Sequence, residues 1–294
     1  MSDTSIPSPL GAFSAAVAEL VRGAALSVVS VKSERAHSSG FVWRSGLIVA
    51  AENALADDGE IEIVAHDGAS TRAELVGRDP STDVALLRVQ RTDLPQVSPS
   101  PRAAAAGALA LVVAAREGAA AASLGIVSYA GPQWRSMRGG LIDARIELST
   151  ALRRSSEGGL ALDAEGRAFG MAVFGPRRRT LVIPLATINR VAATLVAKGR
   201  VARGYLGLGL QPVKLEGGGL GLMAISVAKG PGAAAGVKQG DVIVAWNGEP
   251  LRGLHHLMRL LGSDSVGATA KLSLRRAGEP LELDLTIGER PQAP

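Results

Sequence analysis

The residues of this chain best suited to nucleophilic or acid–base chemistry lie in two short segments. One is the run Ser155-Ser156-Glu157, followed by two glycines, and the other contains Asp83. A serine hydroxyl becomes a nucleophile only when a base within hydrogen-bond reach accepts its proton. By residue type alone, Glu157 and Asp83 could form an acid–base pair of carboxyl groups. The chain has no cysteine, which excludes thiolate nucleophiles, disulfides and cysteine-based zinc sites.

Positive charge is the second chemical signal. The 294 residues include 32 Lys and Arg against 27 Asp and Glu, a formal net charge of +5. Arginines cluster at Arg153-Arg154 and at Arg177-Arg178-Arg179. Such a patch is either a solvated basic surface or a face for an acidic protein partner. We expect no nucleic acid as a partner, because aromatic residues make up only 3% of the chain and no recognition motif accompanies the charge.

The elements that must position these residues are mainly short strands. From 38 to 195, apolar runs of about five to eight residues alternate with Gly, Pro, Asp or Ser, which favours an all-β barrel or sandwich. Helical spacing occurs in 11–26, 186–199 and 253–262, and Gly199 supplies a stop signal. The domain organisation we expect is an N-terminal helical segment at 1–26, a β domain at 27–199, a linker at 200–203 and a second domain at 204–290.

Five segments carry a family resemblance, in the order SSGFVWRSGLIVAAENAL, GRDPSTDVALLRV, LGIVS, STALRRSSEGGLALDAEGRAFG and LVIPLATINRVAATLVAKGRVARGYLGL. Together they resemble the trypsin-like serine proteases of the HtrA/Deg type. The resemblance implies a trypsin-like double six-stranded β-barrel. It also places the family's catalytic His, Asp and Ser on Asn53, Asp83 and Glu157, respectively.

Two of these three positions hold residue types that cannot play the family's roles. The amide of Asn53 does not take up a proton near neutral pH. Glu157 puts negative charge where an oxyanion must develop. On this basis we expect no functional catalytic residue and predict that the chain is not an enzyme but an inactive relative of serine endopeptidases. The alternative is an active endopeptidase with a rearranged site around Ser155 and Ser156, with His37, which lies just before the strand at Ser38-Ser39-Gly40, as its histidine.

The second domain resembles a PDZ domain through GPGAAAGVKQGDVIVAWNGEPL at 230–251 and through Gly204-Tyr205-Leu206-Gly207-Leu208, which is similar to the carboxylate-binding loop of bacterial PDZ domains. Successive backbone N–H groups in such a loop form a nest for a terminal carboxylate, and the peptide then adds as a strand. The peptide-binding residues that we expect are Tyr205, Leu206, Gly207, Leu208, Leu257 and Leu261.

These observations predict a pseudoprotease that acts as a peptide-binding scaffold or accessory factor, through its PDZ groove and its basic former active-site face. The expected partners are protein or peptide C-termini, and an acidic protein or an active paralogue. A homo-oligomer, a trimer by the family's pattern, is a further expectation, with Phe13 packing either within the chain or between subunits. We expect no cofactor and no metal.

The N-terminal ten residues contain no Lys or Arg and so lack the basic region of a secretory signal. This favours a cytoplasmic location, or a periplasmic one if a leader was removed. No stretch of about 18 uncharged apolar residues occurs, so we expect no membrane span.

Overall fold

The computed structural model describes residues 8–34, 36–57, 59–215 and 218–291. The first seven residues, on which the expected absence of a leader partly rests, lie outside this range. The chain divides into two compact units. The first contains Met1–Trp134 and Ile142–Arg200, and the second contains Arg135–Leu141 and Val201–Pro294. None of the helices in the described ranges is long and apolar enough to cross a membrane.

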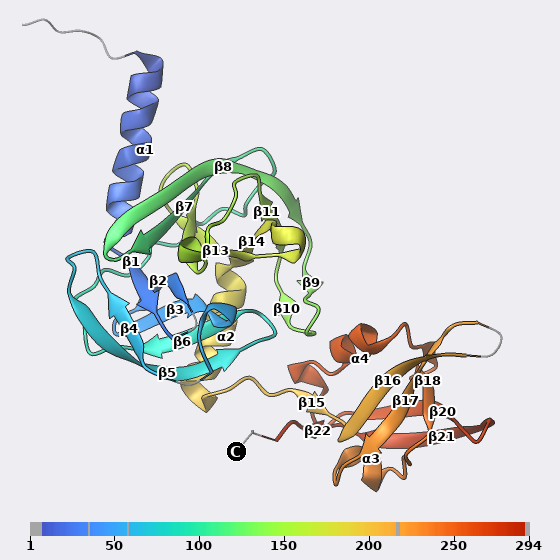
Figure 1. Cartoon of the computed structure of the whole chain (residues 1–294). Helices are drawn as coiled ribbons and strands as arrows, with labels where there is room; N and C mark the ends of the chain where they lie inside the picture. The colour runs from blue at the N-terminus through green and yellow to red at the C-terminus, as the bar shows by residue number, and fades with distance from the viewer. Residues whose placement is uncertain (1–7, 35, 58, 216–217, 292–294) are drawn as a thin grey trace, which may run out of the picture. The chain divides into compact units, whose positions relative to one another are not determined.

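Two closed antiparallel barrels make up the first unit (Figure 1). The strand order of barrel one is β1-β2-β3-β6-β5-β4, and that of barrel two is β11-β14-β13-β12-β7-β8. The strands of barrel one are β1 Val28–Lys32, β2 His37–Arg44, β3 Leu47–Ala51, β4 Ile61–Val64, β5 Ser70–Asp79 and β6 Val84–Arg88. The strands of barrel two are β7 Leu109–Arg116, β8 Ala119–Gly131, β11 Arg145–Leu148, β12 Gly159–Leu162, β13 Ala168–Phe174 and β14 Thr180–Pro184. The predicted double six-stranded barrel is confirmed.

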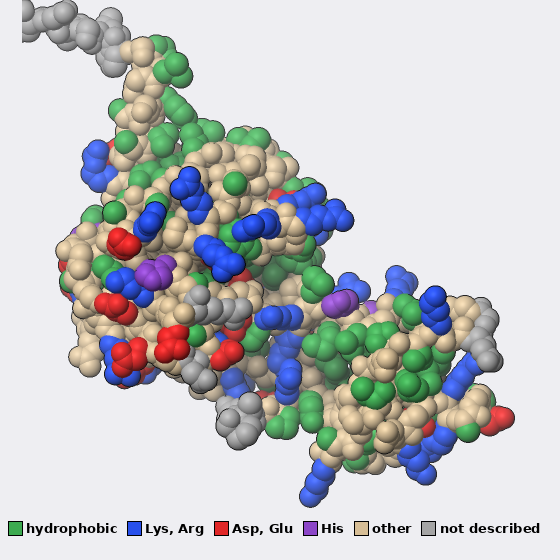
Figure 2. Space-filling model, viewed as in Figure 1, with side chains coloured by type: hydrophobic (Ala, Val, Ile, Leu, Met, Phe, Trp, Pro, Cys, Tyr) green, Lys and Arg blue, Asp and Glu red, His purple; other side chains and the backbone are tan. Residues whose placement is uncertain are grey.

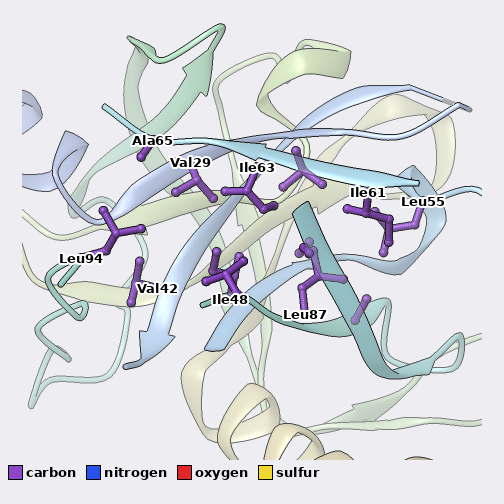
Figure 3. Packing of buried hydrophobic residues seen from close by; sticks show 14 residues of the cluster. Val29, Val42, Ile48, Leu55, Ile61, Ile63, Ala65, Leu87 and Leu94 are labelled. Atoms are coloured by element: carbon purple, nitrogen blue, oxygen red, sulfur yellow. The ribbon is translucent and has the colours of Figure 1, made fainter. Parts of the chain in front are cut away.

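Barrel one is filled by aliphatic side chains from alternate strand positions, because successive side chains point to opposite faces of a strand. Val29, Ile48 and Ile63 come from three different strands and are fully buried in this core. Figure 3 shows them pointing toward one another with Leu55 and Leu87 nearby. This packing fixes the ends of β3 and β6, from which the loops of the candidate site emerge.

Four helices and several short elements complete the part of the chain that the structure describes. The helices are α1 Pro9–Ala25, α2 Leu185–Lys198, α3 Pro231–Ala234 and α4 Leu254–Leu260. Single turns of 3₁₀-helix are η1 Glu52–Ala54, η2 Arg154–Ser156, η3 Pro176–Arg178 and η4 Ser263–Ser265. A small two-stranded sheet joins β9 Trp134–Arg135 to β10 Leu141–Ile142. Gly199 ends α2 in the left-handed conformation, φ 68°, as its stop signal predicts.

The second unit is an antiparallel sheet with two short helices, α3 and α4. Its main sheet has the order β16-β17-β18-β20-β21, with β19 paired to β18. The strands are β15 Gly204–Tyr205, β16 Leu208–Lys214, β17 Leu220–Val227, β18 Val242–Trp246, β19 Glu249–Pro250, β20 Thr269–Arg276, β21 Glu279–Thr286 and β22 Gly288–Glu289. The turn Ala277-Gly278 joins β20 to β21, and both residues have positive φ, as a tight hairpin turn requires.

Candidate functional site

The barrel unit brings Asp83 and Asn53 into direct contact. Asn53 lies in η1, directly after β3, and Asp83 precedes β6. One carboxylate oxygen of Asp83, Oδ1, accepts the backbone N–H of Asn53 at 2.8 Å. Asp83 itself has φ 60°, in the left-handed region that Asp and Asn tolerate better than most side chains. The Asp83 loop is therefore built to aim this carboxyl at the η1 turn.

Burial dominates the electrostatics of Asp83. Its side chain is almost fully enclosed, and desolvation raises the pKa of its carboxyl from 3.8 to about 7. The hydrogen bond from the backbone of Asn53 acts in the opposite direction, and the negative charges of Glu157 and Glu52 raise this pKa further. Near neutral pH, Asp83 is therefore about half protonated.

Glu157 follows η2 at the start of β12. Its carbonyl oxygen accepts the backbone N–H of Ser39 at 2.8 Å, and Ser39 Oγ donates to the carbonyl oxygen of Ser155 at 2.7 Å. The next residue, Gly158, has φ 84°, and a Cβ there would lie 2.1 Å from the carbonyl oxygen of Ser39. Only glycine fits at this position without displacing β2, so the loop that presents Glu157 is held closely against barrel one.

Asn53 and Glu157 line one cleft of about 360 Å³, together with Ala36, Ala54, Arg154, Phe174 and Arg178. The hydrogen bond joins Asp83 to Asn53, and Asn53 and Glu157 line the same cleft. The structure thus brings these three residues together. Ser155 and Ser156 are not among the residues that line it, and Ser156 is buried. His37 is exposed beside Glu62, whose pKa its charge helps to lower. The rearranged site with His37 as its base therefore receives no support from this geometry.

Arg178 also lines a second, larger cleft of about 730 Å³. This cleft contains Arg145, Glu147 and Arg179. Arg145 and Arg179 both pair with Glu147, at 2.7 and 3.0 Å, and these bonds hold the pKa of the Glu147 carboxyl below its usual range. Of the predicted basic patch, Arg154, Arg178 and Arg179 line a cleft, whereas Arg153 and Arg177 are exposed outside both.

Arg145 and Glu147 were not among the residues expected at the site from the sequence. Their spacing of two residues in a predicted strand was the available signal, because residues i and i+2 lie on the same face of a strand. Phe174 was also missed, and nothing in its sequence context distinguishes it from other apolar strand ends.

In the second unit, β16 lies at an edge of its sheet, and within the described ranges it pairs only with β17. It follows Gly207, whose φ is 73°. Helix α4 lies beside β16 (Figure 1). Of the predicted pocket leucines, Leu206, Leu257 and Leu261 are buried in the domain core. Leu208 is only partly buried, and Tyr205 is half-buried.

Among the residues that the structure describes, no cluster of three or more His, Asp or Glu side chains could hold a metal ion.

Two family models match this chain, one for the trypsin-like peptidase domain at residues 38–171 and one for the PDZ domain at residues 204–287. The chain belongs to the HtrA-type family of trypsin-like serine proteases with a PDZ domain.

Named relatives agree with this assignment. A probable periplasmic serine endoprotease, DegP-like, of Bartonella henselae is 31% identical over 271 residues, which cover 87% of this chain and 53% of that protein. Its counterpart in Pseudomonas putida is 32% identical over 270 residues, covering 86% and 56% of the two chains. This chain thus spans about half the length of the curated relatives it matches.

Solved structures give the same fold. The serine endoprotease from Yersinia pestis superimposes with a TM-score of 0.70 at 25% identity, covering 98% of this chain and 100% of that one. The HtrA-type protease AlgW with a decapeptide gives a TM-score of 0.69 at 22% identity, covering 94% and 99%.

These comparisons correct one prediction from the sequence. The expectation that the chain is not an enzyme is wrong, because the relatives and the structural neighbours are named serine endoproteases. That expectation extrapolated from the residue types at two positions, Asn53 and Glu157, to the class of the whole protein. The expected cytoplasmic location also receives no support, since the curated relatives are named periplasmic.

Proposed function

We propose that this chain binds the C-terminal segments of other polypeptides along the β16 edge of its PDZ domain. The observation that carries the proposal is the pairing of β16, which has β17 on one side and no strand on the other within the described residues. An edge strand offers unpaired N–H and C=O groups, to which an extended peptide can add as a further strand.

The loop before β16 sets the direction in which a peptide would bind along this edge. Gly207, with φ 73°, turns the chain in this loop, and in the proposed complex the N–H groups of Leu206, Gly207 and Leu208 hold the terminal carboxylate. Tyr205 opens this loop. Leu208 is the partly buried wall of the pocket for the last peptide side chain, and Leu257 and Leu261 support that wall from the core.

Isothermal titration calorimetry on the full chain tests this function. The ligands are neutral decapeptides that end in an apolar residue, with either a free C-terminal carboxylate or an amide. We expect the free acid to bind at least tenfold more tightly, because the amide removes the charge that the loop N–H groups hold. Equal affinities for the two peptides would contradict the proposal.

A second candidate function is peptide-bond hydrolysis by an HtrA-type endopeptidase with a rearranged site. It is favoured by the names of the relatives, which are serine endoproteases. In this function Ser155 or Ser156 supplies the oxygen nucleophile, and the titratable groups near the cleft are Asp83 and Glu157.

Casein degradation and labelling by a fluorophosphonate probe test the second function. We compare the natural chain with Ser155→Ala and Ser156→Ala, and with Asn53→His/Glu157→Ser, which restores the family's pair of residue types. Cleavage and labelling that disappear in one serine variant support this function. An inert natural chain beside an active double variant would contradict it.

Assembly and location complete the proposal. Helix α1 has no buried residue, and its Leu10 and Phe13 side chains are 80% and 44% exposed. The C-terminal part of α1 contacts β1, β7 and β8, whereas its N-terminal part is exposed, so we propose that this exposed part packs in a homo-oligomer, for which a trimer is the family's pattern. The relatives' names favour the periplasm as the location. The basic patch of Arg153, Arg154, Arg177, Arg178 and Arg179 takes an acidic protein partner or a paralogue.

A further inference from the structure

We infer that the cleft at Asn53 and Glu157 holds a single acidic side chain of an extended polypeptide, clamped between Arg154 and Arg178. This inference deepens the proposed function by naming a substrate class for the barrel unit. It does not use the PDZ groove, so each can be tested without the other.

The arginines of the two clefts differ in whether an acidic side chain already balances their charge. Arg145 and Arg179 both pair with the nearly buried carboxylate of Glu147. The positive charges of these two arginines in the larger cleft therefore already have an acidic partner. Neither Arg154 nor Arg178 forms a salt bridge with an acidic side chain in the part of the chain described. Both line the smaller cleft, and both are exposed. An incoming carboxylate would therefore meet two guanidinium groups that are free to fork around it.

The backbone around Arg178 holds it at this position. Arg177 and Arg178 both adopt left-handed φ, 57° and 59°, within η3. Non-glycine residues in this region are strained by about 1 kcal/mol or more each, and such strain persists only where the surroundings enforce it. The guanidinium of Arg178 lies 5.9 Å from the ring centre of Phe174, a cation–π contact with another residue of the same cleft.

The count of charges sets the size of the ligand. Among the described residues that line the cleft, Arg154 and Arg178 stand against one carboxylate, that of Glu157. With Glu157 ionised the net charge is +1, which one Asp or Glu side chain neutralises. A nucleic acid strand presents a regular series of phosphates and is held by a long basic track with stacking aromatics, which this cleft lacks among its lining residues. The cleft therefore suits a peptide with an isolated acidic residue.

A nuclear magnetic resonance titration of the ¹⁵N-labelled full chain tests this inference. The probe is an acetylated and amidated decapeptide of small neutral residues with one central Glu, and the matched peptide carries Gln there. Because both ends are capped, neither peptide offers the PDZ loop a terminal carboxylate. We expect the Glu peptide to shift the side-chain Nε–H signals of Arg154 and Arg178 and to bind at least fivefold more tightly than the Gln peptide.

Variants separate a specific clamp from general charge attraction. R154Q/R178Q should abolish the preference for Glu, and R154K/R178K should keep part of it. The control R88Q/R116Q removes the same charge from two exposed arginines of the barrel unit that line neither cleft, and should bind as the natural chain does.

Three results would overturn the inference. The first is equal affinity for the Glu and Gln peptides, and the second is an equal loss of binding in R88Q/R116Q. The third is a competition experiment in which a single-stranded oligonucleotide displaces the bound Glu peptide at a lower concentration than additional Glu peptide does. None of these results bears on the free-acid and amide peptides that test the PDZ groove.

Discussion

The carboxylate of Asp83 accepts its hydrogen bond from the backbone N–H of Asn53, at 2.8 Å. A carboxylate in this position of a trypsin-like fold usually orients an imidazole. Here the partner residue is Asn53, whose backbone and side chain both hydrogen-bond Asp83 and which also lines the cleft. Burial raises the pKa of the same carboxyl to about 7, so its protonation state changes near neutral pH.

The raised pKa of Asp83 predicts a pH-dependent cost to folding. Its carboxyl titrates at about 7 in the folded chain, against 3.8 in the unfolded reference. Between these two values the folded state binds the extra proton, so the stability contributed by Asp83 falls as the pH rises through this window. The variant Asp83→Asn mimics the protonated form and tolerates the positive φ.

Urea unfolding of the natural chain and Asp83→Asn measures this effect. We expect similar free energies of unfolding at about pH 4, and a natural chain less stable than the variant by about 4 kcal/mol at about pH 8. Carboxyls with lowered pKa, such as those of Glu147 and Asp241, gain stability as the pH rises but cancel in this comparison. A constant difference across the range would contradict the prediction.

The glycine after Glu157 gives a steric prediction. Gly158→Ala should destabilise the chain by about 2–4 kcal/mol, because its new Cβ would collide with the Ser39 carbonyl and its φ is positive. Gly68 is the control, since its φ of 77° is similar but no atom lies within 4 Å of a Cβ there. Gly68→Ala should cost only about 1 kcal/mol in the same urea experiment. If the two variants are equally stable, β2 does not confine the Glu157 loop.

In the PDZ domain, the half-buried Arg276 pairs with the buried carboxylate of Asp241. Asp241 is 1% exposed and accepts two hydrogen bonds from Arg276, at 2.8 and 2.9 Å, which lower the pKa of its carboxyl. Arg276→Ala leaves that carboxylate without its cation and should cost about 3 kcal/mol. The neighbouring Arg275 is exposed, so Arg275→Ala should change the melting temperature little. Matching losses in the two variants would refute the role given to this pair.

The exposed face of α1 predicts how assembly can be broken. Light scattering on the eluted natural chain should give the mass of a homo-oligomer, and Leu10→Asp/Phe13→Asp should give a monomer, because charge on this face prevents its burial. Glu19→Gln, a change on the same helix at an exposed polar position, is the control. A natural chain that elutes as a monomer at all concentrations would show that α1 makes no such contact.

The elements of this fold could be predicted from the sequence because their signals are local. Gly199 marks the end of α2, and Ala277-Gly278 marks the hairpin between β20 and β21, since each signal depends on backbone conformation alone. The helix expected at 253–262 is shorter in the structure, Leu254–Leu260, and Leu261 leaves helical geometry although its side chain stays in the core. The apolar spacing in the sequence therefore extends past the end of the helix because Leu261 is buried, although it is not helical.

The candidate site was less predictable because its contacts join distant segments. The segment order placed Asn53, Asp83 and Glu157 at one site, and the structure brings these residues together. Which arginines are neutralised depends on Glu147 and on the strained turn at Arg177 and Arg178, neither of which has a sequence signal of its own. The prediction that the chain is not an enzyme failed for a related reason. It used the types of two side chains, Asn53 and Glu157, to decide the class of the whole protein.

Hydrogen exchange on the full chain, with and without a free-acid decapeptide, tests the central claim most directly. If the peptide adds as a strand to the PDZ sheet, the backbone amides of β16 and of Leu206–Leu208 should exchange at least tenfold more slowly in its presence. Strand β21, at the opposite edge of the same sheet, should be unaffected. Protection confined to β21 or to the barrel unit, or no protection at saturating peptide, would contradict the account.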